Sequence, residues 1–393
     1  MKKIGFLLTL AALIAGTACR AQNGGSLPQN NEEISQNGDG IAFEDSTVTF
    51  ADACAKAKTE GKMIFIDCYT SWCGPCKRMA NEIFPQKVVG DFFNKTFVCL
   101  KKDMEKGEGM ELQKKYSVRA FPTMLFLDAS GSEVNRIVGA ASDAAKFVEK
   151  VRGGLGEGSL TAMNAKYDAG RRDTAFVYAY LRVLDDAMQS KKAEAVTEEL
   201  IKGREQALFT DSALYNALMR FTEDKDSPAF IFFSNNKDEL YKHYPKKDVD
   251  WKIWYVWFNT AEKSIYWGDD KKYHFDDSLM TAVEKEMAER NVESAEKISW
   301  NVRAKAAQKT GNFKLAADYV LKYDKKYKAT EYMIGTLGED YTDSPDCGKD
   351  KKLHKAITKL VGDRLQELKA KPKDEFYDWI PDYEEVIRKL AGK

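Results

Sequence analysis

Two patterns of apolar residues divide the chain into two regions. Between about residues 46 and 157, short and nearly continuous apolar runs alternate with segments of helical periodicity. A short run that is apolar throughout predicts a strand buried on both faces. The predicted strands are residues 62–69, 95–103, 123–128 and 133–139, and the predicted helices are 50–60, 77–84, 109–118 and 142–155. Strands that alternate with helices predict a central sheet covered on both faces.

Several predicted helix ends carry capping or breaking signals. Thr47 or Thr49 can cap the first helix, and Ser142 is the predicted cap of the last one. Pro85 is expected to end or kink the second helix, because proline lacks the N–H group that a helix interior uses.

Residues 158–393 have helical periodicity with few strand signals. They predict an all-α, irregular helical-repeat domain of tetratricopeptide-like style, although the repeats are too degenerate to fix a period. In residues 172–188, Asp173 can cap a helix. One face of that helix is formed by Phe176, Val177, Tyr180, Leu181, Leu184 and Met188. Residues 291–309 and 310–327 predict a helix–turn–helix pair.

The first residues are typical of an export signal, predicted to span residues 1–21. Two lysines precede an apolar stretch that ends near Ala18 and is too short to span a bilayer comfortably. Cleavage after Ala21 would free the mature chain. Cleavage after Ala18 would instead leave Cys19 at its start, as in bacterial lipoproteins.

The predicted mature chain begins with a flexible leader at residues 22–45, because this stretch is rich in polar residues and glycine. Export places the protein in the periplasm or cell envelope, where disulfides persist. A lipid anchor on Cys19 is the one membrane attachment that the sequence suggests. Gly16 argues against it, because a lipidation signal normally has a branched aliphatic residue there.

Composition argues against nucleic acid as a partner and against chemistry that depends on histidine or a metal ion. The 61 basic and 61 acidic residues balance, so bulk charge gives no reason to expect nucleic acid as partner. The three histidines are far apart in the sequence, at His243, His274 and His354. Their scarcity weakens most hypotheses of a metal site or of histidine-dependent catalysis, and no metal or cofactor is expected.

The stretch "WCGPCK" contains Cys73 and Cys76, the pair with the strongest chemical signal. A structural zinc site needs four ligands, and the chain has no second pair of this spacing. A structural disulfide would close so short a loop that it would constrain the unfolded chain little. A catalytic dithiol is therefore the favoured interpretation.

The predicted strand-to-helix turn places Cys73 at a helix N-terminus, where unpaired N–H groups favour the thiolate. Cys73 is then expected to attack a partner's disulfide and form a mixed disulfide. Cys76, one turn later, would resolve it. A buried carboxylate such as Asp67 could accept the proton from Cys76; the alternative for Asp67 is a polar strand residue bonded to backbone.

Four motifs in order resemble the thioredoxin fold family over about residues 46–157. They are "WCGPCK", "YSVRAFPT", "IVGAAS" and an aspartate, Asp67, six residues before Cys73. The resemblance implies that Asp67 is the buried acid and that Pro122 is a cis-proline beside the dithiol. An ordinary trans proline is the alternative. It also implies a substrate-binding surface formed by Trp72, Gly74, Pro75, Phe121, Thr123 and Gly139.

Two further cysteines, Cys68 and Cys99, lie inside predicted strands. Alignment to the family places Cys99 near the position where a lysine normally accompanies the buried acid, which puts the tuning of Asp67 in doubt. One hypothesis is a third thiol that traps or regulates the pair. The alternative is that both cysteines are small apolar core residues.

The sequence therefore favours an exported thiol–disulfide oxidoreductase that exchanges disulfides with protein substrates. Gly74 and Pro75 between the cysteines resemble the reducing members of the family, so a reductase is expected. That role requires a membrane electron donor. The alternative is an envelope binding or scaffold protein in which the helical repeats recognise a partner and the redox domain is auxiliary.

An aromatic-rich stretch at residues 250–267 is the most conspicuous part of the helical region. Trp251, Trp254 and Phe258 fall on one predicted helix face, with Tyr255 and Trp257 to the sides. Such a stripe usually forms core between stacked helices. The alternative is a groove that holds unfolded or peptide substrate near the dithiol.

Overall fold

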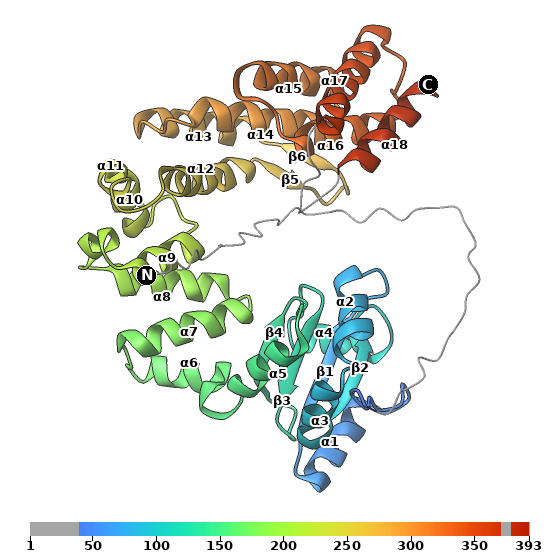
Figure 1. Cartoon of the computed structure of the whole chain (residues 1–393), viewed down its shortest axis with the longest axis vertical. Coiled ribbons are helices and arrows are strands. Elements are labelled where there is room, and N and C mark those ends of the chain that lie inside the picture. The colour runs from blue at the N-terminus through green and yellow to red at the C-terminus, as the bar shows by residue number, and fades with distance from the viewer. Residues whose placement is uncertain (1–38, 371–378, 393) are drawn as a thin grey trace.

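The computed structural model describes residues 39–370 and 379–392. The predicted export signal, Cys19 and residues 22–38 of the predicted leader lie outside the described residues. Figure 1 shows a small α/β domain followed by an arc of helices that curls over one end of it. Among the described residues, no helix combines the length and apolar character needed to cross a membrane.

A four-stranded mixed sheet forms the centre of the α/β domain. Its strands are β1 (Met63–Tyr69), β2 (Phe97–Asp103), β3 (Thr123–Leu127) and β4 (Glu133–Val138), in the order β2-β1-β3-β4. Strand β1 is parallel to β2 and antiparallel to β3, and β3 is antiparallel to β4. Helices cover both faces (Figure 1), which confirms the predicted fold class of a mixed sheet flanked by helices.

The helices of this domain follow the predictions with three differences. They are α1 (Phe50–Glu60), α2 (Gly74–Arg78), the π-helical turn η1 (Met79–Ile83), α3 (Lys87–Thr96), α4 (Glu108–Lys115) and α5 (Ala144–Gly153). Helix α3 was not predicted, and α2 begins three residues earlier than expected. Asp143, not Ser142, caps α5, because its carboxylate accepts the N–H of Lys146 at 2.8 Å. Thr49 caps α1.

Part of the predicted flexible leader is packed against the sheet. The N–H of Ile41 donates to the carbonyl of Phe84 at 2.9 Å, and the N–H of Glu44 donates to Cys99 at 2.8 Å. Phe43 forms a bridge beside β2, so this segment protects that edge of the sheet. The prediction of a leader reaching residue 45 is therefore wrong for residues 39–45, since Ile41 and Phe43 have apolar surface to bury.

The remaining described chain is mainly helical. Its helices are α6 (Leu160–Asp168), α7 (Thr174–Asp186), α8 (Ser190–Ile201), α9 (Ser212–Phe221), α10 (Pro228–Asn235), α11 (Lys237–Leu240), α12 (Lys246–Glu262), α13 (Asp277–Glu289), α14 (Ala295–Lys309), α15 (Phe313–Tyr327), α16 (Glu331–Thr342), α17 (Lys351–Lys369) and α18 (Ile380–Ala391), with 3-10 turns η2 (Gly156–Gly158) and η3 (Glu205–Phe209). The expectation of an all-α domain is wrong at one place. Strands β5 (Ile265–Trp267) and β6 (Tyr273–Phe275) form an antiparallel hairpin between α12 and α13.

The predicted helix at residues 172–188 is α7, and Asp173 caps it by accepting the N–H of Phe176 at 3.0 Å. Five of its six predicted core residues are buried. The sixth, Met188, follows the helix end with a φ of 51° and is half exposed, because the chain has already turned away.

The arc is fixed to the other edge of the sheet, at β4. The side-chain oxygen of Asn135 accepts the N–H of Leu160 at 3.3 Å, and Asn135 itself is buried. The hydroxyl of Thr161 donates to the carbonyl of Glu133 at 2.9 Å. These bonds come from α6 and cover the free edge of β4, so the first helices of the arc form one unit with the sheet.

The aromatic stretch of α12 is arranged differently from the prediction. Trp257, expected at the side of the helix, is only 1% exposed and lies in the core. Trp251 stacks on Tyr255, and Trp254 stacks on Phe258, with all four side chains half-buried. The predicted three-residue stripe is therefore not the most buried face, because neighbouring helices contact α12 on more than one side.

A buried lysine lies on the same helix. Lys252 is fully buried, and its ammonium donates to the carbonyl of Met219 at 2.9 Å. Burial lowers the pKa of Lys252 to about 8, against the opposing effect of Glu223 and Glu194. The folded state therefore holds this proton less tightly than the unfolded chain does.

Replacing this lysine should stabilise the helical region near neutral pH. The unfolded pKa is about 10.4, so the wild type gains stability as pH rises from about 8 to about 10. We expect Lys252→Met to raise the free energy of unfolding by about 1–3 kcal/mol at pH 7 and by less at pH 10. Calorimetry of the full chain at both pH values measures this. Lys247→Met, an exposed position on α12, is the control; equal effects of both variants would contradict the expectation.

Candidate active site around Cys73 and Cys76

The two cysteines lie where β1 leads into α2. Cys73 caps α2, Cys76 lies in its first turn, and their sulfurs form a disulfide. The N–H of Cys76 points at Cys73 Sγ at 3.1 Å. In the reduced state this N–H is placed to donate to a thiolate on Cys73, which lowers the cost of its charge. Both side chains are nearly buried, so a partner disulfide must approach closely.

Aromatic and backbone groups form a rim beside the disulfide. Trp72 is 52% exposed, and its ring packs edge-on against Phe121 at 6.0 Å. Its Nε1 donates to Glu105 at 2.9 Å, which holds the indole in place. Glu105 was not among the predicted site residues, and nothing in its sequence surroundings marks it.

The segment carrying Pro122 completes the rim. The Phe121–Pro122 peptide bond is cis. The carbonyl of Pro122 accepts the N–H of Gly139 at 2.9 Å, and Gly139 has a φ of 99° that favours glycine. The hydroxyl of Thr123 donates to the carbonyl of Ala120 at 2.7 Å, so it stabilises its own turn. Gly74 and Pro75 occupy the first two positions of α2.

Asp67 lies on β1 and lines the same cavity as Cys76. It is 1% exposed, and neither carboxylate oxygen has a hydrogen-bond partner among the described residues. Burial raises the pKa of Asp67 to about 7, and the positive charge of Lys101 opposes that rise. A carboxyl group with this pKa can exchange a proton near neutral pH, as an acid–base group must.

Lys101 is a site residue that the sequence alignment missed. In the register of β1 and β2, Asp67 lies beside Lys101, and Cys99 lies beside Phe65. The lysine that the alignment expected near the acid is therefore present, and placing Cys99 there was wrong by two residues. Lys101 also lies over the ring of Tyr69, with 5.1 Å from its nitrogen to the ring centre. Paired residues of adjacent parallel strands lie on the same face of the sheet. The error therefore came from assuming the wrong register between β1 and β2.

The two other strand cysteines pack in separate parts of the core. Cys68 lies with Ile64 and Ile66 on one face of the sheet, and Cys99 lies with Phe65 on the other. Both are buried, and burial raises the pKa of each thiol. A raised pKa disfavours the reactive thiolate, which agrees with the small-apolar-residue interpretation rather than with a regulatory thiol.

A cavity of about 150 Å³ opens beside Cys76. It is lined by Asp67, Tyr69, Thr70, Ser71, Cys76, Lys77, Ala80, Asn81 and Lys101. Asp67, Cys76 and Lys101 thus line one cavity, although they come from β1, α2 and β2. The cavity gives the buried carboxyl group a route for proton exchange.

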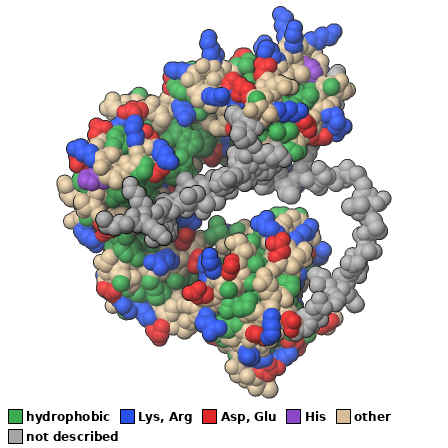
Figure 2. Space-filling model, in the orientation of Figure 1, with side chains coloured by type: hydrophobic (Ala, Val, Ile, Leu, Met, Phe, Trp, Pro, Cys, Tyr) green, Lys and Arg blue, Asp and Glu red, His purple; other side chains and the backbone are tan. Residues whose placement is uncertain are grey.

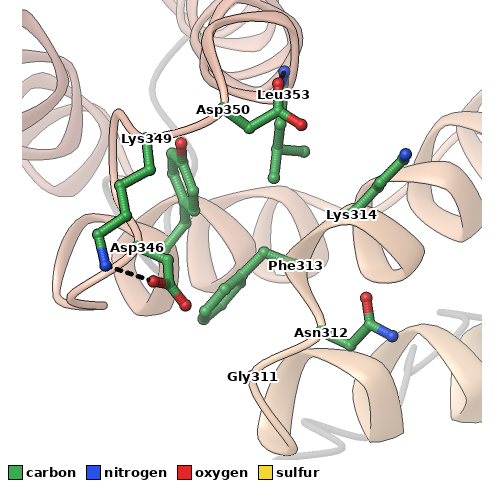
Figure 3. Close-up of a pocket in the computed structure, with 9 residues that line it drawn as sticks. Gly311, Asn312, Phe313, Lys314, Asp346, Lys349, Asp350 and Leu353 are labelled. Atoms are coloured by element: carbon green, nitrogen blue, oxygen red, sulfur yellow. Dashed lines mark hydrogen bonds and ion pairs between the residues drawn. The ribbon is translucent and has the colours of Figure 1, made fainter.

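A larger cavity of about 290 Å³ lies in the helical region, between the starts of α15 and α17 (Figure 3). Three of its charged groups have partners within the chain. Asp346 pairs with Lys349 at 2.8 Å, and Asp350 caps α17 by accepting backbone N–H groups. It shares no residue with the cavity beside Cys76, so it is not part of the dithiol site.

Comparison with known proteins agrees with this geometry. A family model described as a thioredoxin-like domain matches residues 50–152. Residues 50–152 form a thioredoxin-like domain. This stretch contains the four strands, the cysteine pair, Asp67 and Pro122, so the family resemblance carried by the motifs is confirmed.

Named relatives match part of the chain. A "Thioredoxin H-type" of Oryza sativa subsp. indica is 40% identical over 90 residues, which are 22% of this chain and 66% of the rice protein. "Thiol:disulfide interchange protein DsbD" of Pseudoalteromonas atlantica is 31% identical over 88 residues, 22% of this chain but 15% of that protein. The chain therefore spans less than two thirds of these relatives.

One solved structure has a higher identity over its matched part. It is the solution structure of a candidate disulphide-isomerase from Bacteroides thetaiotaomicron, 51% identical, with a TM-score of 0.27. The match covers 30% of this chain and 94% of that protein.

The buried carboxylate should destabilise the thioredoxin-like domain above neutral pH. The unfolded pKa of an aspartate is about 3.9, so the folded state takes up a proton between about pH 4 and pH 7 and loses stability as pH rises through that window. We expect Asp67→Asn to raise the free energy of unfolding by up to about 4 kcal/mol at pH 8, and by little at pH 4.

Differential scanning calorimetry of the oxidised full chain at pH 4 and pH 8 measures this difference. Asp91→Asn, which removes an exposed carboxylate paired with Lys87, is the matched control and should change stability by well under about 1 kcal/mol. A gain for Asp67→Asn that is equal at both pH values would show that the carboxyl group is not titrating in this window.

Proposed function

We propose that this protein is an exported thiol–disulfide oxidoreductase that exchanges disulfides with protein substrates through Cys73 and Cys76. The observation that carries the proposal is the arrangement around the pair. The N–H of Cys76 is aimed at Cys73 Sγ, and Asp67, a buried carboxyl group with a pKa of about 7, lines the same cavity as Cys76. This arrangement supports a nucleophilic thiolate and a proton acceptor in one site.

The first step uses Cys73. Its thiolate attacks one sulfur of a partner disulfide, the partner's S–S bond breaks, and the second partner sulfur leaves as a thiolate. A mixed disulfide joins Cys73 to the partner. The rim formed by Trp72, Phe121 and the cis Pro122 lies where an extended segment of the partner would have to rest.

The second step uses Cys76 and Asp67. The thiol of Cys76 gives its proton to the Asp67 carboxylate through the shared cavity and attacks Cys73 Sγ. The Cys73–Cys76 disulfide forms, and the partner sulfur leaves as a thiolate that takes up a proton from solvent. Two electrons have moved from the pair to the partner, and the protein reaches the oxidised state seen in this structure.

Substitution of the cysteines should separate these two steps. Cys73→Ser should abolish insulin-disulfide reduction, because it removes the attacking sulfur. Cys76→Ser should also abolish turnover but accumulate a mixed disulfide, which non-reducing mass spectrometry detects. Cys54→Ser, at a half-buried thiol on α1, is the control and should leave activity unchanged. A well-folded wild type without activity would favour the scaffold alternative.

The direction of electron flow is proposed to be reduction. Gly74 and Pro75 match the sequence of reducing members, and the pair would then need re-reduction by a membrane electron donor in the envelope. The partial match to a thiol:disulfide interchange protein supports such a redox partner without identifying it. Equilibration with dithiothreitol or glutathione buffers tests the direction. A potential near about −270 mV supports a reductase, and one near about −120 mV supports an oxidant.

The helical arc is proposed to position the substrate polypeptide. Figure 1 shows the arc curling over the end of the α/β domain that carries α2, with the β5–β6 hairpin on the facing part. In Figure 2 the described atoms of these two parts meet on the left of the view and are separated on the right. Because consecutive strand residues point to opposite faces, the hairpin exposes Tyr266 (51%) on one face and Trp267 (60%) on the other. Each offers an aromatic surface to a partner. An unfolded, disulfide-bonded polypeptide could contact the hairpin and Cys73 together.

Removing the hairpin aromatics should weaken binding of large substrates only. We expect the double variant Tyr266→Ala/Trp267→Ala to raise KM for a denatured, disulfide-bonded protein by roughly tenfold, at about 0.5–1.5 kcal/mol per aromatic contact. The rate with oxidised glutathione should not change, since this peptide cannot span the space. Leu321→Ala, at an exposed position on α15, is the control. An unchanged KM for the denatured protein would exclude the hairpin from substrate binding.

A further inference from the structure

The cavity beside Cys76 contains a buried hydroxyl group to which the mechanism above gives no role. Thr70 is the first residue after β1, and it is 1% exposed. Its Oγ1 has no hydrogen-bond partner among the described residues, and neither has either oxygen of Asp67. All three oxygens belong to residues that line this one cavity.

Unpartnered buried oxygens are unusual, because each costs free energy unless it binds water or protein. A cavity of about 150 Å³ has room for several waters, and the polar side chains of Ser71, Asn81 and Lys101 also line it. The hydroxyl of Thr70 and the carboxyl of Asp67 are therefore expected to share hydrogen-bonded water next to Cys76.

The backbone of Thr70 is tied to the cysteine turn. Its carbonyl accepts the N–H of Cys73 at 3.2 Å, which holds Thr70 against the turn that carries the dithiol. Its β-branched side chain has few χ1 rotamers, which limits the positions that Oγ1 can occupy. Thr70 was absent from the sequence-predicted site residues, because a threonine beside a strand end has many ordinary roles.

We propose that Thr70 is a positioning residue of this site: its hydroxyl, through water in the cavity, orients the Asp67 carboxylate toward Cys76. The inference deepens the proposed function, since it names a group that prepares the second step of disulfide exchange. A hydroxyl that donates toward the charged carboxylate favours the ionised form, and its loss favours the protonated form.

The test must distinguish the effect of the Thr70 hydroxyl from the effects of the other groups around Asp67. Lys101 on β2 provides the positive charge, and Cys76 and Lys77 on α2 line the same cavity. Tyr69 lies on the same strand. Strand β3 places Met124 beside Asp67 in register, and that side chain has no charge. A Thr70 variant changes none of these groups, so a change in the Asp67 titration reports the hydroxyl.

Thr70→Val removes the hydroxyl with almost no change in shape, and Thr70→Ser retains it. The titration of Asp67 is followed in the oxidised full chain by carbon-13 NMR or infrared spectroscopy, which needs no turnover. We expect Thr70→Val to raise the pKa of Asp67 by about one unit, and the acid limb of the pH–rate profile to move with it. Thr70→Ser should match the wild type.

An Asp67 titration in Thr70→Val that equals the wild type would overturn the inference. If Thr70→Val fails to fold, Thr70→Ala gives the same comparison, because it also removes the hydroxyl. A further outcome is that Thr70→Val loses activity while the Asp67 titration and the pH–rate profile both stay unchanged. That result would mean a purely structural role for Thr70 and would also overturn the inference. A wild type that reduces no disulfide would overturn the proposed function alone, since the carboxyl titration is read independently.

Discussion

The junction between β1 and α2 is the constraint on which the site depends. Strand β1 is hydrogen-bonded to β2 on one side and β3 on the other, so its residues cannot shift along the sheet. This fixes Asp67 in the interior, Thr70 at the strand end and Cys73 at the start of the helix. A slip of one residue would move Asp67 to the opposite face of the sheet, away from the cysteines.

The burial of Asp67 has opposite consequences for stability and chemistry. An uncompensated carboxylate in the core costs free energy when ionised. Among the described residues, the positive charge of Lys101 is what opposes this cost. The same cost moves the pKa of Asp67 into the range where the group can accept the proton of Cys76. The domain thus retains a destabilising group at the point where its proposed chemistry needs a base.

The two edges of the sheet explain how a small domain and a long helical arc form one molecule. The segment around Ile41 and Phe43 covers the β2 edge, and α6 covers the β4 edge through Asn135. An uncovered edge would present unpaired backbone groups to other chains. Because the arc begins at a covered edge, its start is fixed relative to the dithiol, and the position of the β5–β6 hairpin follows from the packing of successive helices.

The amino-acid sequence determined the elements whose signal is local. Continuous apolar runs specified the four strands, and the spacing of Cys73, Cys76 and Asp67, with the segment around Pro122, specified the family and its dithiol. Tertiary structure decided which residues meet. Strand register put Lys101 rather than Cys99 beside Asp67, and cavity shape joined Thr70 to the same site. Helix neighbours buried Trp257 and left Trp251 half-buried, although both are tryptophans on one helix. Local patterns record which residues are apolar or polar, whereas register and packing depend on distant segments that no short stretch of sequence contains.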